Sequence, residues 1–360
     1  MVRLHRSVTG AKAALDDQSR WLRDEILPHA EADWRAGPGG FEQLLALRAL
    51  GATGDEILEI GETMLAEATA ARDAICAEID PAMTPAEVGE EVKGNHPATF
   101  PEALAAYREA IARARAFVVE HDLVTFPTRD RILVLETPPY ERQLVPFAAY
   151  YDPAAFDPDP AGTYLVTPPE TPEMMREHSY PAISNTSVHE AYPGHHLQLA
   201  VAMANPSRVR LLAQSATEYI EGWAFYGEKM MKEAGFDDTP PNRYIYQTDI
   251  MWRACRIVLD VRLHRGEIGL DEAVEFLVQR IGFERPAAVS EVHWYTQSPT
   301  YPLSYLYGRH MIEALRADVA RRMGPAFSLK FFHDVFISGG TMPVSFTRRL
   351  FETRLDGLAR

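Results

Sequence analysis

Residues 189–196 read His-Glu-Ala-Tyr-Pro-Gly-His-His, and this stretch is the most informative part of the sequence. Three imidazoles and a carboxylate fall within it, although the whole chain of 360 residues has only 12 histidines. The stretch begins like HExxH, a motif in which two histidines one helical turn apart bind zinc and the glutamate activates water. Pro193, however, stands where that motif has its second histidine. The sequence therefore predicts a metal site with unusual ligand spacing.

The Pro-Gly pair decides which histidines can share one ion. The ring of Pro193 clashes with the carbonyl of residue 189, and Gly194 provides backbone freedom for the helix to deform there. A two-residue bulge would bring His195 into the ligand position. In a regular helix, His196 would share a face with His189 but lie about 10 Å away along the axis. We expect His189 and His195 to be ligands, with His196 supporting them or serving as an alternative ligand.

The same stretch also allows a purely structural interpretation. Ser187 and Glu190 have the spacing of a capping box, which would make Glu190 a helix-start residue. A polar cluster around an unusual Pro-Gly in mid-helix nevertheless indicates a functional site more than a helix start. We therefore expect Glu190 to be the water-activating base.

A third ligand should come from another segment, and carboxylates are common in that role. Residues 218–226 read EYIEGWAFY, in which Glu218 and Glu221 lie three positions apart and face one way on an otherwise apolar helix. Carboxylates on such a face are costly to bury unless they are paired or bind a metal. We expect Glu221 to be the ligand and Glu218 a supporting or alternative one. A surface salt bridge is the competing interpretation for both.

Other polar residues are candidates for supporting roles. Asp260 shares a predicted helix with Arg256, so it either orients a ligand or belongs to an ion-pair ladder. Residues 293–310 gather phenols, imidazoles and a guanidinium suited to a developing oxyanion or a substrate carboxylate. Arg309 in that segment and the distant Arg142 are candidates for binding a substrate carboxylate.

Composition restricts the class of protein. The net charge is −15, and no cluster of Lys and Arg offers a surface for nucleic acid or an anionic membrane. No apolar run approaches the ~20 residues of a membrane helix, and the first residues lack the apolar region of a signal peptide. We expect Cys76 and Cys255 to be free thiols. The sequence predicts a cytoplasmic protein, and a homodimer is compatible with it.

Periodicity predicts a mainly α fold with a small sheet. Apolar residues recur at helical spacing near 11–35, 55–80 and 101–121, and a motif helix is expected over about 185–203. Residues 131–135 and 163–167 are predicted strands, separated by a loop rich in Pro, Asp and Tyr. We expect an N-terminal helical lobe with the sheet over 1–180, and a C-terminal helical lobe with the motif over 181–360.

Five segments resemble domain of unknown function family 885, a bacterial group in the zincin-like metallopeptidase clan: HEAYPGHHLQ, EGWAFY, RIVLDVRLH, SYLYG and FSLKFFHDVFISGGTMP. The clan also contains Taq-type carboxypeptidases, thimet oligopeptidase and angiotensin-converting enzyme. The resemblance extends from about residue 20 to the C-terminus. Family members are usually longer at the N-terminus, so the chain resembles a shortened member.

The resemblance implies a zincin-like helical fold with a cleft between two helical lobes and the sheet beside the metal-binding helix. By position, His189, His195 and Glu221 correspond to the ligands and Glu190 to the base. Tyrosine and histidine residues of the C-terminal lobe steady the tetrahedral intermediate in the peptidase relatives. Here the candidates in that region are Tyr305 and His310.

These observations favour a Zn²⁺-dependent hydrolase, a metallopeptidase or amidase acting on a peptide or small amide. Two alternatives remain. The same ligands can serve a tailoring enzyme for a small metabolite, either a lyase or a redox enzyme that uses Fe²⁺. The third interpretation is a non-catalytic helical scaffold.

Overall fold

The structure is a computed structural model that describes residues 2–31, 33–142, 144–145, 147–157, 159–212 and 216–358. The chain divides into two compact units, Met1–Arg35 and Ala36–Arg360. The first unit contains helix α1 (Val2–Trp21), followed by a π-helical turn (Leu22–Ile26) and a 3-10 turn (Leu27–His29).

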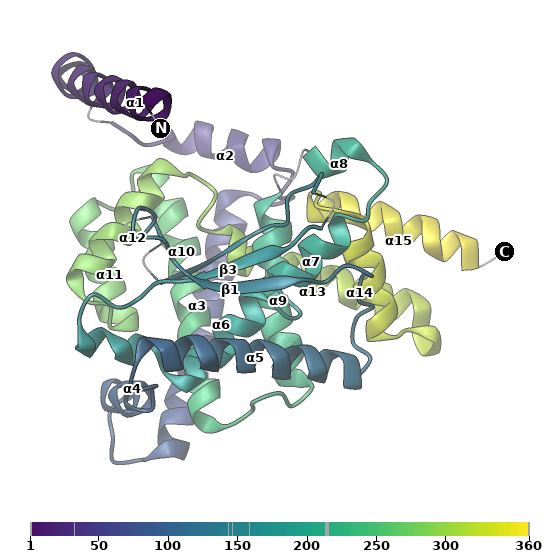
Figure 1. Cartoon of the computed structure of the whole chain (residues 1–360). Helices are drawn as coiled ribbons and strands as arrows, with labels where there is room; N and C mark the ends of the chain where they lie inside the picture. The colour runs from purple at the N-terminus through teal and green to yellow at the C-terminus, as the bar shows by residue number, and fades with distance from the viewer. Residues whose placement is uncertain are drawn as a thin grey trace. The chain divides into compact units, whose positions relative to one another are not determined.

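The second unit is mainly helical, as predicted (Figure 1). Short 3-10 turns cover Pro172–His178 and Gly324–Ala326. The α-helices are α2 (Gly37–Leu47), α3 (Gly54–Ile79), α4 (Pro85–Gly94), α5 (Phe100–Glu120), α6 (Tyr180–Glu190), α7 (His195–Ala202), α8 (Arg208–Leu212), α9 (Thr217–Glu233), α10 (Pro240–Arg265), α11 (Leu270–Ile281), α12 (Arg285–Gln297), α13 (Ser304–Met323), α14 (Leu329–Ser338) and α15 (Val344–Leu358). Among the described helices, none is both long and apolar enough to cross a membrane.

Local sequence explains where several helices begin. Helices α3, α4 and α5 each start at a threonine whose hydroxyl accepts the third helical N–H, while a glutamate three residues on accepts the threonine N–H. These reciprocal hydrogen bonds satisfy N–H groups that a helix start otherwise leaves without partners. The three pairs are Thr53 with Glu56, Thr84 with Glu87, and Thr99 with Glu102.

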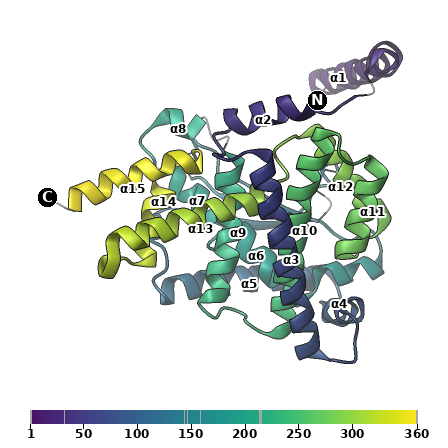
Figure 2. The same ribbon diagram turned by 180° about the vertical axis from the view of Figure 1, so that it is seen from behind.

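A three-stranded sheet lies against the helices, with the strand order β1-β3-β2. Strands β1 (Ile132–Glu136) and β3 (Gly162–Val166) are parallel, with Val134 opposite Tyr164, and they confirm the two predicted strands. Strand β2 (Ala148–Tyr151) pairs antiparallel with β3 where only a loop was expected. These four residues form a strand because the edge of β3 is available for pairing. Such a tertiary contact cannot be predicted from the local sequence. Figure 2 shows the long helices α3 and α13 on the side away from the sheet.

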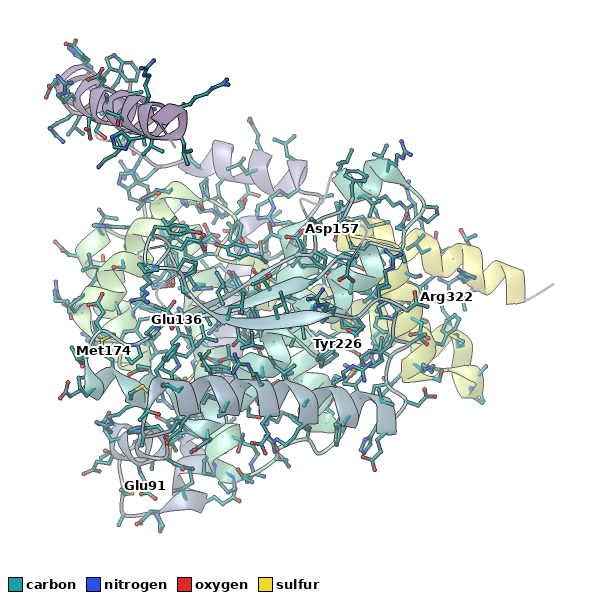
Figure 3. All side chains as sticks on the ribbon, viewed as in Figure 1. Glu91, Glu136, Asp157, Met174, Tyr226 and Arg322 are labelled. Atoms are coloured by element: carbon teal, nitrogen blue, oxygen red, sulfur yellow. The ribbon has the colours of Figure 1, made fainter. Side chains whose placement is uncertain are left out.

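The predicted boundary at residue 180 lies inside the second unit. One hydrophobic core combines Tyr107 and Tyr164, which precede that boundary, with Trp223 and Tyr226, which follow it. All four side chains are fully buried, and Figure 3 shows Tyr226 among the packed side chains, with Arg322 toward the periphery. Residues from both halves of the chain therefore share one core.

Helices α9 and α13 approach each other closely at two glycines. A Cβ on Gly222 would lie 2.5 Å from the carbonyl carbon of Gly308, and a Cβ on Gly308 would overlap the carbonyl oxygen of Glu218. Backbone atoms cannot move aside as a flexible side chain can. This contact fixes α9, which carries Glu221, against α13.

Substitution Gly222→Ala should therefore lower the free energy of unfolding by about 2–3 kcal/mol, the cost of overpacking a tightly packed interior. Urea denaturation followed by circular dichroism measures the change. Gly39→Ala is the matched control, because no heavy atom lies within 4 Å of a Cβ there. Equal stabilities for the two variants would show that the close approach does not constrain the fold.

Candidate metal centre

The sequence analysis predicted one helix over about 185–203. The structure instead has two helices there. Helix α6 ends at Glu190, and α7 begins at His195. Pro193 has no N–H to donate and cannot continue the ladder of α6, so residues 191–194 form a turn. Gly194 is required in this turn because a Cβ there would overlap the carbonyl oxygen of His189. The indole N–H of Trp223 donates to the carbonyl of Pro193 at 2.8 Å, which ties the turn to α9.

The turn brings His189 and His195 to one carboxylate on α9. His189 Nε2 lies 3.5 Å and His195 Nε2 lies 3.3 Å from Glu221 Oε2. One potential ligand atom from each residue lies within 4.8 Å of the others. Tetrahedral zinc with bonds of about 2.0–2.1 Å would separate its ligand atoms by about 3.3–3.4 Å. The two distances to Glu221 Oε2 match this separation, so the three side chains could hold one zinc ion.

Two buried polar atoms of this cluster lack hydrogen-bond partners among the described residues, as expected for side chains that could bind a metal. Glu221 Oε2 is buried and accepts no hydrogen bond from the described residues, and His195 Nδ1 is a second buried atom without a partner. Burial would raise the pKa of Glu221, but the neighbouring His195 and His189 hold it below its usual range. Burial would lower the pKa of His189, but Glu221 and Glu228 raise it to about 10. The cluster thus stabilises positive charge at its centre.

Glu228, which the sequence analysis missed, orients the first histidine. Its Oε1 lies 2.7 Å from His189 Nδ1. If Nδ1 donates this bond, Nε2 keeps its lone pair for a metal. Asn185 donates to Glu228 Oε2 and to Asp249, both at 2.9 Å, and Arg253 donates to Asp249 at 3.0 Å. This series of hydrogen bonds from Arg253 through Asp249 and Asn185 holds the Glu228 carboxylate in place.

His196 faces away from the cluster, although it is adjacent to His195. Its Nδ1 lies 2.9 Å from the hydroxyl of Tyr150, and its Nε2 lies 3.1 Å from Asp130 Oδ1. Asp130 also accepts hydrogen bonds from Tyr192 and Arg115. The alternative in which His196 replaces His195 as a ligand does not match this geometry, because both of its ring nitrogens already have partners.

Glu218 and Asp260, the two acidic residues expected to support the metal site, form their hydrogen bonds elsewhere in the fold. Glu218 is buried and accepts a hydrogen bond from Arg48 at 3.0 Å. Asp260 accepts the backbone N–H groups of Thr300 and Leu303 at 3.0 and 3.2 Å, and burial raises its pKa to about 7. Asp260 therefore anchors the segment that leads into α13. Neither carboxylate belongs to the cluster of potential ligands.

Glu190 and Tyr305 lie close to the cluster. Glu190 is half-buried beside His189, and no described residue is hydrogen-bonded to its carboxylate. Burial and then the charge of Glu221 raise the pKa of Tyr305 well above its ordinary value, so its hydroxyl stays protonated at neutral pH. His310 instead stacks on Tyr307, with ring centroids 5.9 Å apart.

Both arginine candidates already have acidic partners. Arg309 lies 3.2 Å from Glu313 and donates to the hydroxyl of Tyr246. Arg142 donates to Glu136 at 2.6 Å. Neither lines the cavity at the cluster, an open space of about 240 Å³ bounded by Tyr150, Asp152, His195, Leu199, Ile220 and Glu221.

Adjacent histidines provide a matched test of ligand identity. His195→Ala should lose bound zinc, because it removes one of three converging ligand atoms. His196→Ala should retain stoichiometric zinc, because its ring nitrogens bond elsewhere. Mass spectrometry of metal content on folded protein measures both. Zinc loss in His196→Ala with retention in His195→Ala would reverse the assignment.

Glu228→Gln should weaken zinc binding about 10- to 100-fold while leaving the ligands in place, since residues that orient ligands contribute on this scale. If the Gln oxygen keeps the hydrogen bond to His189 Nδ1, its NH2 group would face the Asn185 NH2 group, which places two donors together without an acceptor. Competition with a fluorescent chelator measures the affinity. Glu109→Gln, on the exposed face of α5, is the control. An unchanged affinity would show that Glu228 does not position His189.

Comparison with known proteins places the chain in a family and a fold. No functionally curated protein matches it. A crystal structure of a predicted lipoprotein from Colwellia psychrerythraea matches 99% of this chain, with 24% identity and a TM-score of 0.84. A predicted lipoprotein of unknown function from Shewanella oneidensis matches 97% of it, with 23% identity and a TM-score of 0.81. This chain covers 62% and 65% of those two chains.

The family model described as bacterial protein of unknown function (DUF885) matches residues 3–350. The match extends over nearly all of the 360 residues and includes the three candidate metal ligands. The chain therefore belongs to the DUF885 family.

Proposed function

We propose that this protein is a zinc-dependent hydrolase of peptide or amide bonds with a zincin-like arrangement of its site. One observation carries the proposal. Two imidazole nitrogens lie 3.5 and 3.3 Å from one buried carboxylate oxygen, beside a cavity. Three protein ligands with a fourth position open to the cavity are typical of catalytic zinc, whereas structural zinc has four protein ligands.

His189, His195 and Glu221 would hold the ion. When bound, zinc supplies Lewis acidity, which polarises a carbonyl group and makes water a stronger acid. Glu228 keeps His189 in the orientation that binding requires.

Glu190 is the proposed general base. It directly follows the candidate ligand His189, and its charge adds to the raised pKa of Tyr150 in the cavity wall, after burial, Asp152 and Tyr192. The carboxylate would take a proton from water as the oxygen bonds to the substrate carbonyl carbon. It would then return that proton to the nitrogen as the carbon–nitrogen bond breaks. Tyr305 would donate a hydrogen bond from its hydroxyl group to the oxyanion formed between these steps and would keep its proton.

The sheet edge beside the cavity suits an extended substrate. Strand β2 pairs with β3 on one side, and it carries Tyr150 of the cavity wall. An extended peptide can add to such an edge through main-chain hydrogen bonds, which makes a peptide the preferred substrate over a compact metabolite.

A second candidate follows from the donor set itself. Two histidines and one carboxylate also bind iron in non-haem oxygenases. The metal content of protein purified without added metal distinguishes the two candidates. Stoichiometric zinc supports the hydrolase, and stoichiometric iron supports a redox enzyme.

Glu190→Gln should reduce kcat for peptide or amide hydrolysis by a factor of about 10² to 10⁴, the usual contribution of a general base. Bound zinc should stay stoichiometric, because Glu190 is not among the converging ligands. Hydrolysis assays on zinc-loaded protein, with metal analysis of the same samples, measure both quantities. Loss of zinc, or undiminished turnover, would remove Glu190 from the proposed role.

A further inference from the structure

One wall of the cavity carries an acidic residue that the proposed chemistry does not use. Asp152 directly follows β2 and lines the cavity together with His195 and Glu221. Its side chain is exposed, and no described residue forms a hydrogen bond or ion pair with its carboxylate. Its charge is therefore available to a molecule that enters the cavity.

Two of the residues that line this cavity, Asp152 and Glu221, are acidic, and none of its described lining residues is a lysine or arginine. Burial raises the pKa of the Tyr150 hydroxyl, and Asp152 is the strongest of the charges that raise it further. The two arginines that the sequence offered as anion-binding groups are paired with Glu136 and Glu313 instead. Glu221 would bind the zinc ion directly, whereas no described side chain forms an ion pair with Asp152.

The remaining walls are apolar. Leu199 and Ile220 line the cavity, together with the aromatic ring of Tyr150. An apolar surface that ends at a carboxylate suits a group with a hydrocarbon stem and a cationic tip. An acidic substrate would meet only repulsion from Asp152 there.

We propose that Asp152 is a specificity-determining residue, which favours substrates that carry an ammonium or guanidinium group next to the bond cleaved. The inference rests on the proposed hydrolase and names its substrate class. The cation is either the free α-amino group of a peptide or the side chain of a basic residue, because both present the same chemistry to the carboxylate.

Four anilide substrates separate these two sources of charge. Lysine anilide carries both cations, N-acetyl-lysine anilide only the side-chain cation, norleucine anilide only the α-amino cation, and N-acetyl-norleucine anilide neither. Wild-type protein should cleave at least one cationic substrate with a kcat/KM about two- to fivefold above the uncharged one, the effect of one exposed charge pair. This ratio should fall as salt rises, because exposed charges are screened.

Substitution Asp152→Asn should bring that kcat/KM ratio close to one. Asp157→Asn is the matched control, since Asp157 lies on the same loop but lines the neighbouring cavity (Figure 3). It should keep the wild-type ratio. A ratio that stays unchanged in Asp152→Asn, or that is already close to one in wild-type protein, would overturn the inference.

Binding measurements keep this test separate from the proposed function. If no anilide is cleaved, the hydrolase proposal fails, but the affinity of zinc-loaded protein for lysinamide and norleucinamide still reports on the cavity. The N-acetyl forms of lysinamide and norleucinamide lack the α-amino charge, so they differ only in the charge of the side chain. Tighter binding of any cationic amide than of the uncharged N-acetyl-norleucinamide in wild-type protein, lost in Asp152→Asn, would support the role of Asp152. Equal affinities for all four amides, the uncharged N-acetyl-norleucinamide included, would contradict it.

Discussion

The packing of α9 against the turn between α6 and α7 is the constraint on which the candidate site depends. Helix α9 supplies Glu221, which meets both histidines, and Glu228, which binds the far side of His189. It also supplies Trp223, which holds the carbonyl of Pro193. Helix α9 is fixed in turn by its close approach to α13 at Gly222. Helix α9 thus sets the position of one candidate ligand, Glu221, the orientation of a second, His189, and the turn that places the third, His195.

The electrostatics of the site follow from the same packing. Burying two imidazoles and two carboxylates together is costly unless their charges are balanced. In the outer part of the cluster, Arg253 pairs with Asp249, and Asn185 donates hydrogen bonds to Glu228 and Asp249. The inner oxygen of Glu221 has no hydrogen-bond donor among the described residues. A divalent cation would satisfy that oxygen and both imidazole nitrogens, as the proposed zinc site requires.

Part of this arrangement could be predicted from the sequence, because some patterns are local. Pro193 correctly predicted that the helix is interrupted within the motif. The interruption is a turn between two helices rather than the predicted bulge in one helix. The seven-residue spacing from Glu221 to Glu228 places both on one helical face, so the sequence did carry a signal for Glu228. Strand β2 and the distant partners of His196 could not be predicted, since they depend on contacts between remote segments. The family and the mainly helical fold are confirmed; zinc, hydrolysis, a homodimer and a cytoplasmic location stay predictions.

An X-ray crystal structure of the zinc-loaded protein, with anomalous data at the zinc absorption edge, tests the central claim most directly. The account predicts one strong anomalous peak about 2.0–2.2 Å from the Nε2 atoms of His189 and His195 and a carboxylate oxygen of Glu221. A zinc peak bound by His196 instead of His195, or no peak between these side chains, would contradict it.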